Sequence, residues 1–297
     1  MSDARPLPFE STLQPTVVRP QVPGLSLHAL DWNPGGAPPI LFVHGWMDHA
    51  RGFDPVIEAL PRAWRPLALD LRGHGQSDHL PPGSHYHFTD YLRDVELTLD
   101  FLGLAQAHLV GHSMGGAVCL GYAAARPERV LSLGLIENLG TLGGLPEDAL
   151  RRLKVFLDDA RKPLRKRTYA SLEEAVARVQ ENNPGLSEAG AWHMTRHGTR
   201  PADGGVQFTV DPRIRHQSGM GFDEAQLLAV LRAVRSPVQV IRGAQGYSLP
   251  EEAWGPRLEA LRQPEVLTVE GGHHVHLDRP EEVAGHLERF IAKVSQG

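Results

Sequence analysis

Six short apolar runs constrain the fold of this chain more than any other feature. They span residues 39–43, 66–70, 108–110, 130–136, 238–241 and 266–269, and each leads into a loop. The runs are uninterrupted rather than alternating, which is the pattern of strands in a parallel sheet that is covered on both faces. Segments with one apolar helical face, at 90–102, 114–125 and 281–294, lie between or after them. Strands that alternate with helices predict an α/β fold with a mostly parallel sheet, helices on both faces and right-handed crossovers.

One long interval breaks this alternation. About one hundred residues separate the run that ends near Glu137 from the run that begins at Val238. Most of the interval has helical patterning, and Ser171 with Glu174 has the spacing of a capping box. A structureless loop of this length inside one domain is implausible. We therefore expect a core made of residues 1–139 and 236–297, with a mainly helical cap, or lid, inserted over 140–235.

Charge and cysteine content exclude several classes of protein. The 297 residues carry a formal net charge of −5, which argues against non-specific binding to nucleic acid or to an anionic membrane. The single cysteine, Cys119, rules out a disulfide framework and a cysteine-based zinc site, and we expect it to be a small core residue. The sequence has neither a signal-peptide pattern nor an apolar run long enough to span a membrane. We expect a cytoplasmic location.

The segment Gly111-His112-Ser113-Met114-Gly115 has the pattern G-x-S-x-G, directly after a predicted strand and before a predicted helix. This context is typical of a nucleophile elbow, a sharp turn that lifts a serine hydroxyl clear of the backbone. Glycines two residues to either side avoid a collision within the turn, and the helix N-terminus directs free N–H groups at the site. The pattern predicts that Ser113 is a nucleophile, whereas His112 is interpreted as structural.

A serine nucleophile needs a base to accept its proton. The favoured candidate is His273, which follows two glycines after the last predicted strand, and His274 and His276 are its rivals. The clustered histidines also suggest a metal site, but no further ligand has suitable spacing, so we expect no bound metal. The His44-Gly45-Trp46 segment follows the first strong strand. The backbone N–H groups of Trp46 and Met114 can hold a developing oxyanion, while His44 is interpreted as a brace for its loop.

Taken together, these motifs resemble those of the α/β-hydrolase superfamily in chain order and spacing. The strongest likeness is to serine hydrolase-like proteins, and it rests on residues 44–54, 196–215, 243–252 and 272–284. The resemblance implies a hydrolase with a Ser–His–acid triad. In the superfamily the catalytic histidine lies seven residues before the proline that corresponds to Pro280, which favours His273 over His274.

The position of the acidic member of the triad differs from the pattern of the superfamily. Many relatives have a catalytic aspartate after the penultimate strand, but this chain has Gly246 there, and glycine cannot orient an imidazole. Glu137 ends the strand after the nucleophile's helix, a position at which some members of the superfamily carry their acid. We therefore expect Glu137 to be the acid. The rival carboxylates are Glu251, Glu252, Glu270 and Asp48, whereas Asp70 matches a structural aspartate of the superfamily.

These residues predict a serine hydrolase that cleaves a carboxylic ester of a small molecule through an acyl-enzyme, without a cofactor. The alternatives are the same machinery acting on a carbon–carbon, thioester or lactone bond, and a non-catalytic binding protein that retains the fold. The cap residues that either line an apolar cavity or form the core of the cap are Trp192, His193, Met194 and Phe208. The basic run at 161–167 is interpreted as a solvated helix end, with an acidic substrate as the alternative.

Overall fold

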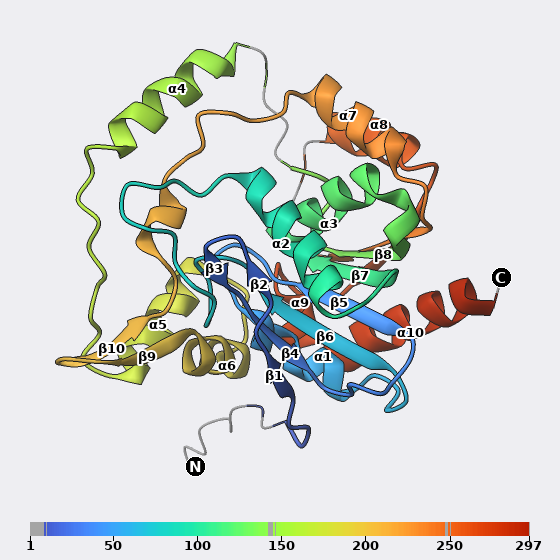
Figure 1. The fold of residues 1–297 in the computed structure, drawn as a ribbon, viewed down its shortest axis with the longest axis horizontal. Coiled ribbons are helices and arrows are strands. Elements are labelled where there is room, and N and C mark those ends of the chain that lie inside the picture. Colours follow the sequence, from blue (N-terminus) through green and yellow to red (C-terminus); the bar gives the residue numbers. More distant parts are fainter. Residues whose placement is uncertain are drawn as a thin grey trace.

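An eight-stranded sheet forms the centre of the protein in the computed structural model (Figure 1). The structure describes residues 9, 11–141, 145, 147–246, 249 and 251–296, without the side chains of residues 251 and 252. The strand order is β1-β4-β6-β5-β7-β8-β11-β12. The strands of this sheet are β1 (Thr16–Val18), β4 (His28–Asp31), β5 (Pro39–Val43), β6 (Arg65–Asp70), β7 (Ala107–His112), β8 (Val130–Ile136), β11 (Val238–Gly243) and β12 (Glu265–Val269).

The sheet is mostly parallel, as predicted. Six consecutive strands, from β6 to β12 in the sheet order, pair in parallel. At one edge β4 runs in the opposite direction and pairs antiparallel with both β6 and β1. All six predicted apolar runs lie within the parallel strands. The edge strands β1 and β4 and the small β2–β3 hairpin (Gln21–Val22 and Leu25–Ser26) were not predicted, because their pairing joins short segments without a strong apolar pattern.

Helices cover both faces of the sheet, and Figure 1 shows α2 and α3 on one side with α1 and α10 on the other. One core cluster packs under α2 and α3, with Val95 and Val118 fully buried, and a second packs under α1 and α10, with Val56 and Leu287 fully buried. The helices of these two layers are η1 (Ala50–Phe53), α1 (Asp54–Glu58), α2 (Phe88–Phe101), α3 (Met114–Ala125), η2 (Pro127–Arg129), α8 (Glu251–Ala260), α9 (Val275–Asp278) and α10 (Pro280–Gln296).

The segment between β8 and β11 forms the insertion. It contains the helices α4 (Asp148–Asp159), α5 (Leu172–Asn182), α6 (Glu188–Gly198), η3 (Pro212–Arg215) and α7 (Glu224–Ala233), together with the β-hairpin of β9 (Thr199–Ala202) and β10 (Gly205–Phe208). Ser171 caps α5 by accepting the N–H of Glu174, but the Glu174 carboxylate accepts from Ala170 rather than from Ser171. The last helix of the insertion, α7, packs against the core and buries its own Leu227 and Leu231 there.

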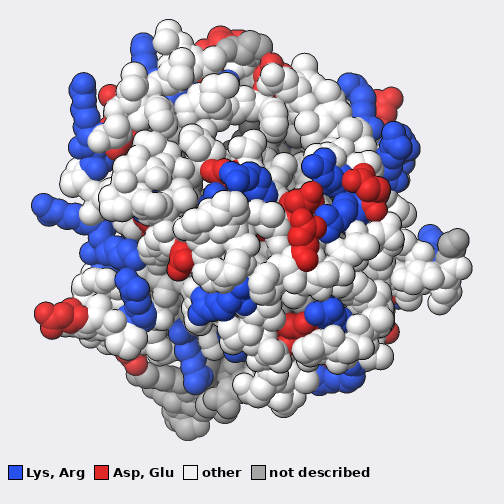
Figure 2. Space-filling model, in the orientation of Figure 1, with Lys and Arg blue, Asp and Glu red and all other residues white. Residues whose placement is uncertain are grey.

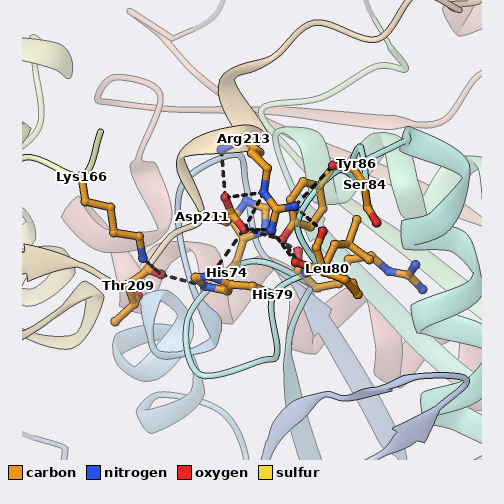
Figure 3. Close-up of polar contacts among 11 residues, drawn as sticks. His74, His79, Leu80, Ser84, Tyr86, Lys166, Thr209, Asp211 and Arg213 are labelled. Carbon is orange, nitrogen blue, oxygen red and sulfur yellow. Dashed lines mark hydrogen bonds and ion pairs between the residues drawn. The ribbon is translucent and has the colours of Figure 1, made fainter. Parts of the chain in front are cut away.

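A shared polar cluster fixes one end of the insertion to a core loop (Figure 3). Asp211 accepts a hydrogen bond from the Tyr86 hydroxyl at 2.9 Å and forms an ion pair with Arg213 at 2.7 Å. Arg213 also donates to the carbonyl oxygens of Leu80 and Pro81. A charge-assisted network of this kind holds its members in one geometry, so the segment after β10 has a defined position on the core.

Within the described residues, no helix combines the length and the apolar character that crossing a bilayer requires.

Candidate active site

The turn between β7 and α3 places Ser113 in an unusual backbone conformation. Its φ and ψ are 50° and −119°, and its N–H donates to the carbonyl oxygen of Ile136 at 2.9 Å. A Cβ atom on Gly111 would lie 2.5 Å from the backbone of Gly115, and one on Gly115 would lie 2.0 Å from the carbonyl oxygen of Val43. Both flanking positions therefore require glycine, as the elbow pattern predicts, and the strained turn projects the serine from the end of the strand.

Glu137 follows β8, on the strand beside the elbow. Its backbone has a φ of 55°, and its N–H donates to the carbonyl oxygen of Ile241 on the neighbouring strand. The carboxylate is 1% exposed, and its Oε1 accepts the N–H of Gly243 at 2.6 Å. Its Oε2 lies 3.1 Å from Nδ1 of His273. The carboxylate is thus held by backbone on one side and contacts an imidazole on the other.

His273 lies in the loop between β12 and α9, with about a third of its side chain exposed. Because Nδ1 faces Glu137, a proton exchanged with a substrate or a nucleophile would pass through Nε2. Ser113, Glu137 and His273 all line one cavity of about 380 Å³. The structure brings together the three residues that the sequence predicted as nucleophile, base and acid.

The rival histidines lie elsewhere. His274 and His276 are buried, and burial lowers the pKa of His274 to about 4 and that of His276 to about 3. Neutral, enclosed imidazoles of this kind do not reach the cavity that Ser113 lines, and neither residue is among its lining. Of the three histidines, His273 is therefore the one that lines the same cavity as Ser113.

The rival carboxylates can be compared in the same way. Glu270 is exposed, and Asp48 lies in a buried histidine cluster where its Oδ1 accepts the N–H of His49. Asp70 holds His28 and the N–H groups of Ala50 and Gln76, which is the structural role expected of it. The side chains of Glu251 and Glu252 lie outside the described residues. Among the described carboxylates, the contact with His273 that the structure records is that of Glu137.

The predicted oxyanion donors sit on two loops that meet at the serine. A Cβ atom on Gly45 would lie 3.3 Å from Cβ of Ser113, which places the loop that carries Trp46 against the elbow. Met114 is the first residue of α3, so its N–H has no intrahelical acceptor. The Trp46 ring is half exposed and donates to the carbonyl oxygen of Ile214 in the insertion.

His44 braces this loop, as interpreted from the sequence. Its Nδ1–H donates to the carbonyl oxygen of Gly45 at 2.7 Å, and its Nε2 accepts the N–H of Leu71 at 3.0 Å. These two bonds require the neutral ring, and burial lowers the pKa of His44. The side chain of Cys119 is buried in α3, which confirms the prediction of a small core residue.

His112, the residue before the nucleophile, has a role that sequence reasoning did not find. Its Nε2–H donates to the carbonyl oxygen of His273 at 2.8 Å, so the strand that carries Ser113 also holds the loop that carries the base. The ring is fully buried, and burial together with His276 and His273 lowers its pKa well below the ordinary value. The neutral state keeps Nε2 as the donor.

Two groups of side chains, buried except for the half-buried His197, could hold a metal ion by the arrangement of their donor atoms. In the first, Asp48, His112 and His276 bring ligand atoms within 4.8 Å of one another, and the second contains Asp54, His193 and His197. The sequence also suggested His273, His274 and His276 as possible metal ligands. The donor atoms of these three histidines do not form a group of this kind, and Nδ1 of His273 contacts Glu137 instead.

An apolar cavity receives the reacting groups. Besides Ser113, Glu137 and His273, the cavity of about 380 Å³ has a mostly apolar lining. Its other members are Phe88, Met114, Ala117, Asn138, Leu139, Gly140, Thr141 and Leu249. Its volume lies in the range of small-molecule sites, and its walls favour a hydrocarbon group. Four residues of the insertion were expected either to line a cavity or to pack in its core. Met194 and Phe208 do both, because they line a second cavity and pack in a cluster mainly within the insertion. Trp192 packs in the same cluster, and His193 is buried.

Comparisons with known proteins identify the family and the fold. The family model described as "alpha/beta hydrolase fold" matches residues 38–280. A serine hydrolase-like protein of Danio rerio is 32% identical, over 92% of this chain and 87% of the relative. A probable serine hydrolase of Drosophila melanogaster is also 32% identical, over 91% and 86%. The crystal structure of a hypothetical protein from Pseudomonas aeruginosa PAO1 superposes with a TM-score of 0.83 at 33% identity, and the match covers 95% of this chain and 99% of that one.

Proposed function

The chain belongs to the α/β-hydrolase fold family, among serine hydrolase-like proteins, and from this membership we propose that it hydrolyses carboxylic esters through Ser113, His273 and Glu137. The observation that carries the proposal is the 3.1 Å contact between Nδ1 of His273 and Oε2 of Glu137, in a cavity that Ser113 also lines. A carboxylate in this position selects the tautomer in which Nε2 can accept a proton.

In the first step, Oγ of Ser113 attacks the carbonyl carbon of the ester, and its proton passes to Nε2 of His273. The carbonyl oxygen becomes an oxyanion, which accepts hydrogen bonds from the N–H groups of Trp46 and Met114. Glu137 remains ionised and stabilises the imidazolium, and the Gly243 N–H keeps the carboxylate in place.

In the second step, the carbon–oxygen bond to the leaving alcohol breaks, and His273 returns its proton to that oxygen. The acyl group then remains on Ser113. Water attacks this acyl-enzyme while His273 takes a proton from it, and collapse of the second tetrahedral intermediate releases the acid and restores the serine hydroxyl. These steps need no metal or organic cofactor.

Two alternatives use the same residues differently. A thioester, lactone or carbon–carbon substrate would follow the same two steps with another leaving group. A non-catalytic binding protein would retain the fold without turnover. The positive φ of Ser113 and the burial of the Glu137 carboxylate favour an enzyme, because each costs folding free energy and each is explained by a catalytic role. We further propose that residues 140–235 act as the cap over this site, and that the reaction takes place in the cytoplasm.

A fluorophosphonate probe tests whether Ser113 is an activated nucleophile. The wild-type protein should form one covalent adduct, located by mass spectrometry on the peptide that contains Ser113, and Ser113→Ala should form none. The matched control is Ser132→Ala, because Ser132 bonds His108 within the sheet and should leave labelling intact. Absence of an adduct at Ser113 in the folded protein would support the binding protein instead.

A further inference from the structure

A second and larger cavity, of about 620 Å³, lies between the core and the insertion. On the core side its walls include Trp46, whose N–H is a proposed oxyanion donor, and His274, which follows the proposed base. On the side of the insertion its walls include Met194 and Phe208. The two cavities share no lining residue, but Trp46 follows Gly45, where an added Cβ would lie 3.3 Å from Cβ of Ser113. The larger cavity therefore lies beside the loop that packs against the elbow.

The charged residues that line this cavity are all cationic. They come from three separate segments, namely the loop after α4, helix α5 and helix η3. Their members are Arg165, Lys166, Arg167, Arg178 and Arg215. No aspartate or glutamate is among the described residues of the lining. Figure 2 shows Lys and Arg side chains along the edge of the molecule where Figure 1 places the segment between α4 and α5.

Only part of this charge is neutralised within the protein. Arg167 pairs with Glu174 and Arg178 pairs with Glu181, each at 2.9 Å. Within the part of the chain that the structure describes, Arg165, Lys166 and Arg215 form no ion pair with a carboxylate. Three uncompensated cations around one cavity create a positive potential that attracts an anion.

Of these three cations, Lys166 has the strongest structural evidence for a role in binding an anion. Its side chain is half-buried, and Nζ donates to the carbonyl oxygen of Thr209 at 3.4 Å, an oxygen that Nε2 of His79 also contacts (Figure 3). Burial and then the charge of Arg200 lower the pKa of Lys166, while the charge of Asp211 opposes them. An ammonium whose charged form is disfavoured in this way gains free energy when a further anion reaches it.

We infer that the natural substrate carries a carboxylate or a phosphate that binds in this basic cavity while its ester bond lies at Ser113. The inference rests on the proposed function. Guanidinium groups bind carboxylate and phosphate oxygens with two parallel hydrogen bonds, and Arg165 and Arg215 offer such forks from opposite segments of the insertion. The apolar cavity lined by Phe88 and Leu139 then takes the uncharged part of the molecule.

Two matched pairs of esters test this inference. In the first pair, the acyl group of 4-nitrophenyl pentanoate ends in a methyl group, and that of mono-4-nitrophenyl glutarate ends in a carboxylate. In the second, phenyl butanoate and 4-phosphonooxyphenyl butanoate differ by a phosphate on the leaving group. We expect kcat/KM to be about tenfold or more greater for the charged member of at least one pair, chiefly through a lower KM, as charge-assisted hydrogen bonds require.

Charge-removing variants locate the effect. Lys166→Gln and Arg215→Gln should lower kcat/KM for the preferred charged ester by about tenfold relative to its neutral match. The matched control is Arg161→Gln, which removes one charge from the same basic run outside the cavity lining and should retain the preference. Thermal denaturation of each variant checks that it is folded.

The outcomes separate this inference from the proposed function. Equal kcat/KM within both pairs, with neutral esters hydrolysed by Ser113, overturns the basic cavity as a substrate site and leaves the serine hydrolase standing. If no ester is hydrolysed and Ser113 forms no adduct, the proposed function fails. The cavity is then tested by calorimetry with the same charged esters on Ser113→Ala, where tighter binding than the neutral esters supports it and equal or absent binding overturns it.

Discussion

The carboxylate of Glu137 occupies the space that a side chain at position 246 would need. A Cβ atom on Gly246 would lie 2.3 Å from both Oε1 and Oε2 of Glu137. The two positions follow adjacent parallel strands, β8 and β11, so side chains at both would occupy the same space at neighbouring strand ends. A carboxylate at one position therefore excludes a side chain at the other, which explains why the loss of the aspartate and the presence of the glutamate occur together.

This exclusion predicts the result of moving the acid. In Glu137→Ala/Gly246→Asp, the space left by the glutamate is free for the aspartate, so we expect kcat for an ester to recover at least tenfold over Glu137→Ala alone. Gly246→Asp in the presence of Glu137 should be inactive or unstable, because two carboxylates would overlap. The kcat values of the three variants show whether an aspartate at position 246 can replace Glu137. Circular dichroism checks that each variant is folded. Equal rates for the double variant and Glu137→Ala would show that position 246 cannot serve His273.

His112 is expected to position the base. His112→Phe keeps an aromatic ring but removes the N–H that holds the carbonyl oxygen of His273. We expect kcat to fall about tenfold with KM nearly unchanged, because a misplaced base acts mainly on the chemical steps, and an unsatisfied buried carbonyl costs about 1–3 kcal/mol of unfolding free energy. Steady-state kinetics and urea denaturation measure the two effects. A loss of stability with kcat unchanged would limit His112 to a structural role.

The buried histidines make stability depend on pH. Burial lowers the pKa of six histidines to about 3 or about 4: His74, His108, His193, His197, His274 and His276. In the unfolded chain a histidine titrates near 6.5. Below about pH 6.5 the unfolded state therefore binds more protons than the folded state, so the free energy of unfolding falls as pH falls toward 4. Asp54, whose pKa burial raises to about 6, offsets one of these protons.

Urea denaturation between pH 7 and pH 5 measures this effect. Each such histidine contributes at most about 1.4 kcal/mol per pH unit. His108→Gln is the control, because His108 contacts Ser132 within the sheet and its replacement should reduce the slope by about one proton. An unfolding free energy that is constant over this range would contradict the buried, neutral state of these rings.

The sequence predicted those parts of the structure that local patterns encode. Continuous apolar runs indicate parallel strands, and the elbow requires glycine at 111 and 115 because of contacts within a few residues. Glu137 was also predictable, because it ends the strand after the nucleophile's helix and because some members of the superfamily, which the chain resembles, carry their acid at that position. The mutual exclusion of Glu137 and Gly246 was not, since it depends on the positions of two atoms from different strands.

The basic cavity lay beyond sequence reasoning for a similar reason. The run at 161–167 was interpreted as a solvated helix end, and its residues are exposed except for the half-buried Lys166. It lies just after α4, which ends at Asp159, and Arg165, Lys166 and Arg167 also line the open cavity. The charges of α5 and η3 that complete it are distant in the chain. Only the packing of the insertion brings these segments together, and no local pattern specifies that packing.

The central claim is that Ser113 and His273 act as one unit with Glu137. It is tested most directly by kcat for one ester in Ser113→Ala, His273→Ala and the double variant. Residues that act as a unit give non-additive losses, so we predict that all three variants fall to the same residual rate. A double variant whose loss equals the product of the two single losses would contradict the claim, because the two side chains would then contribute independently.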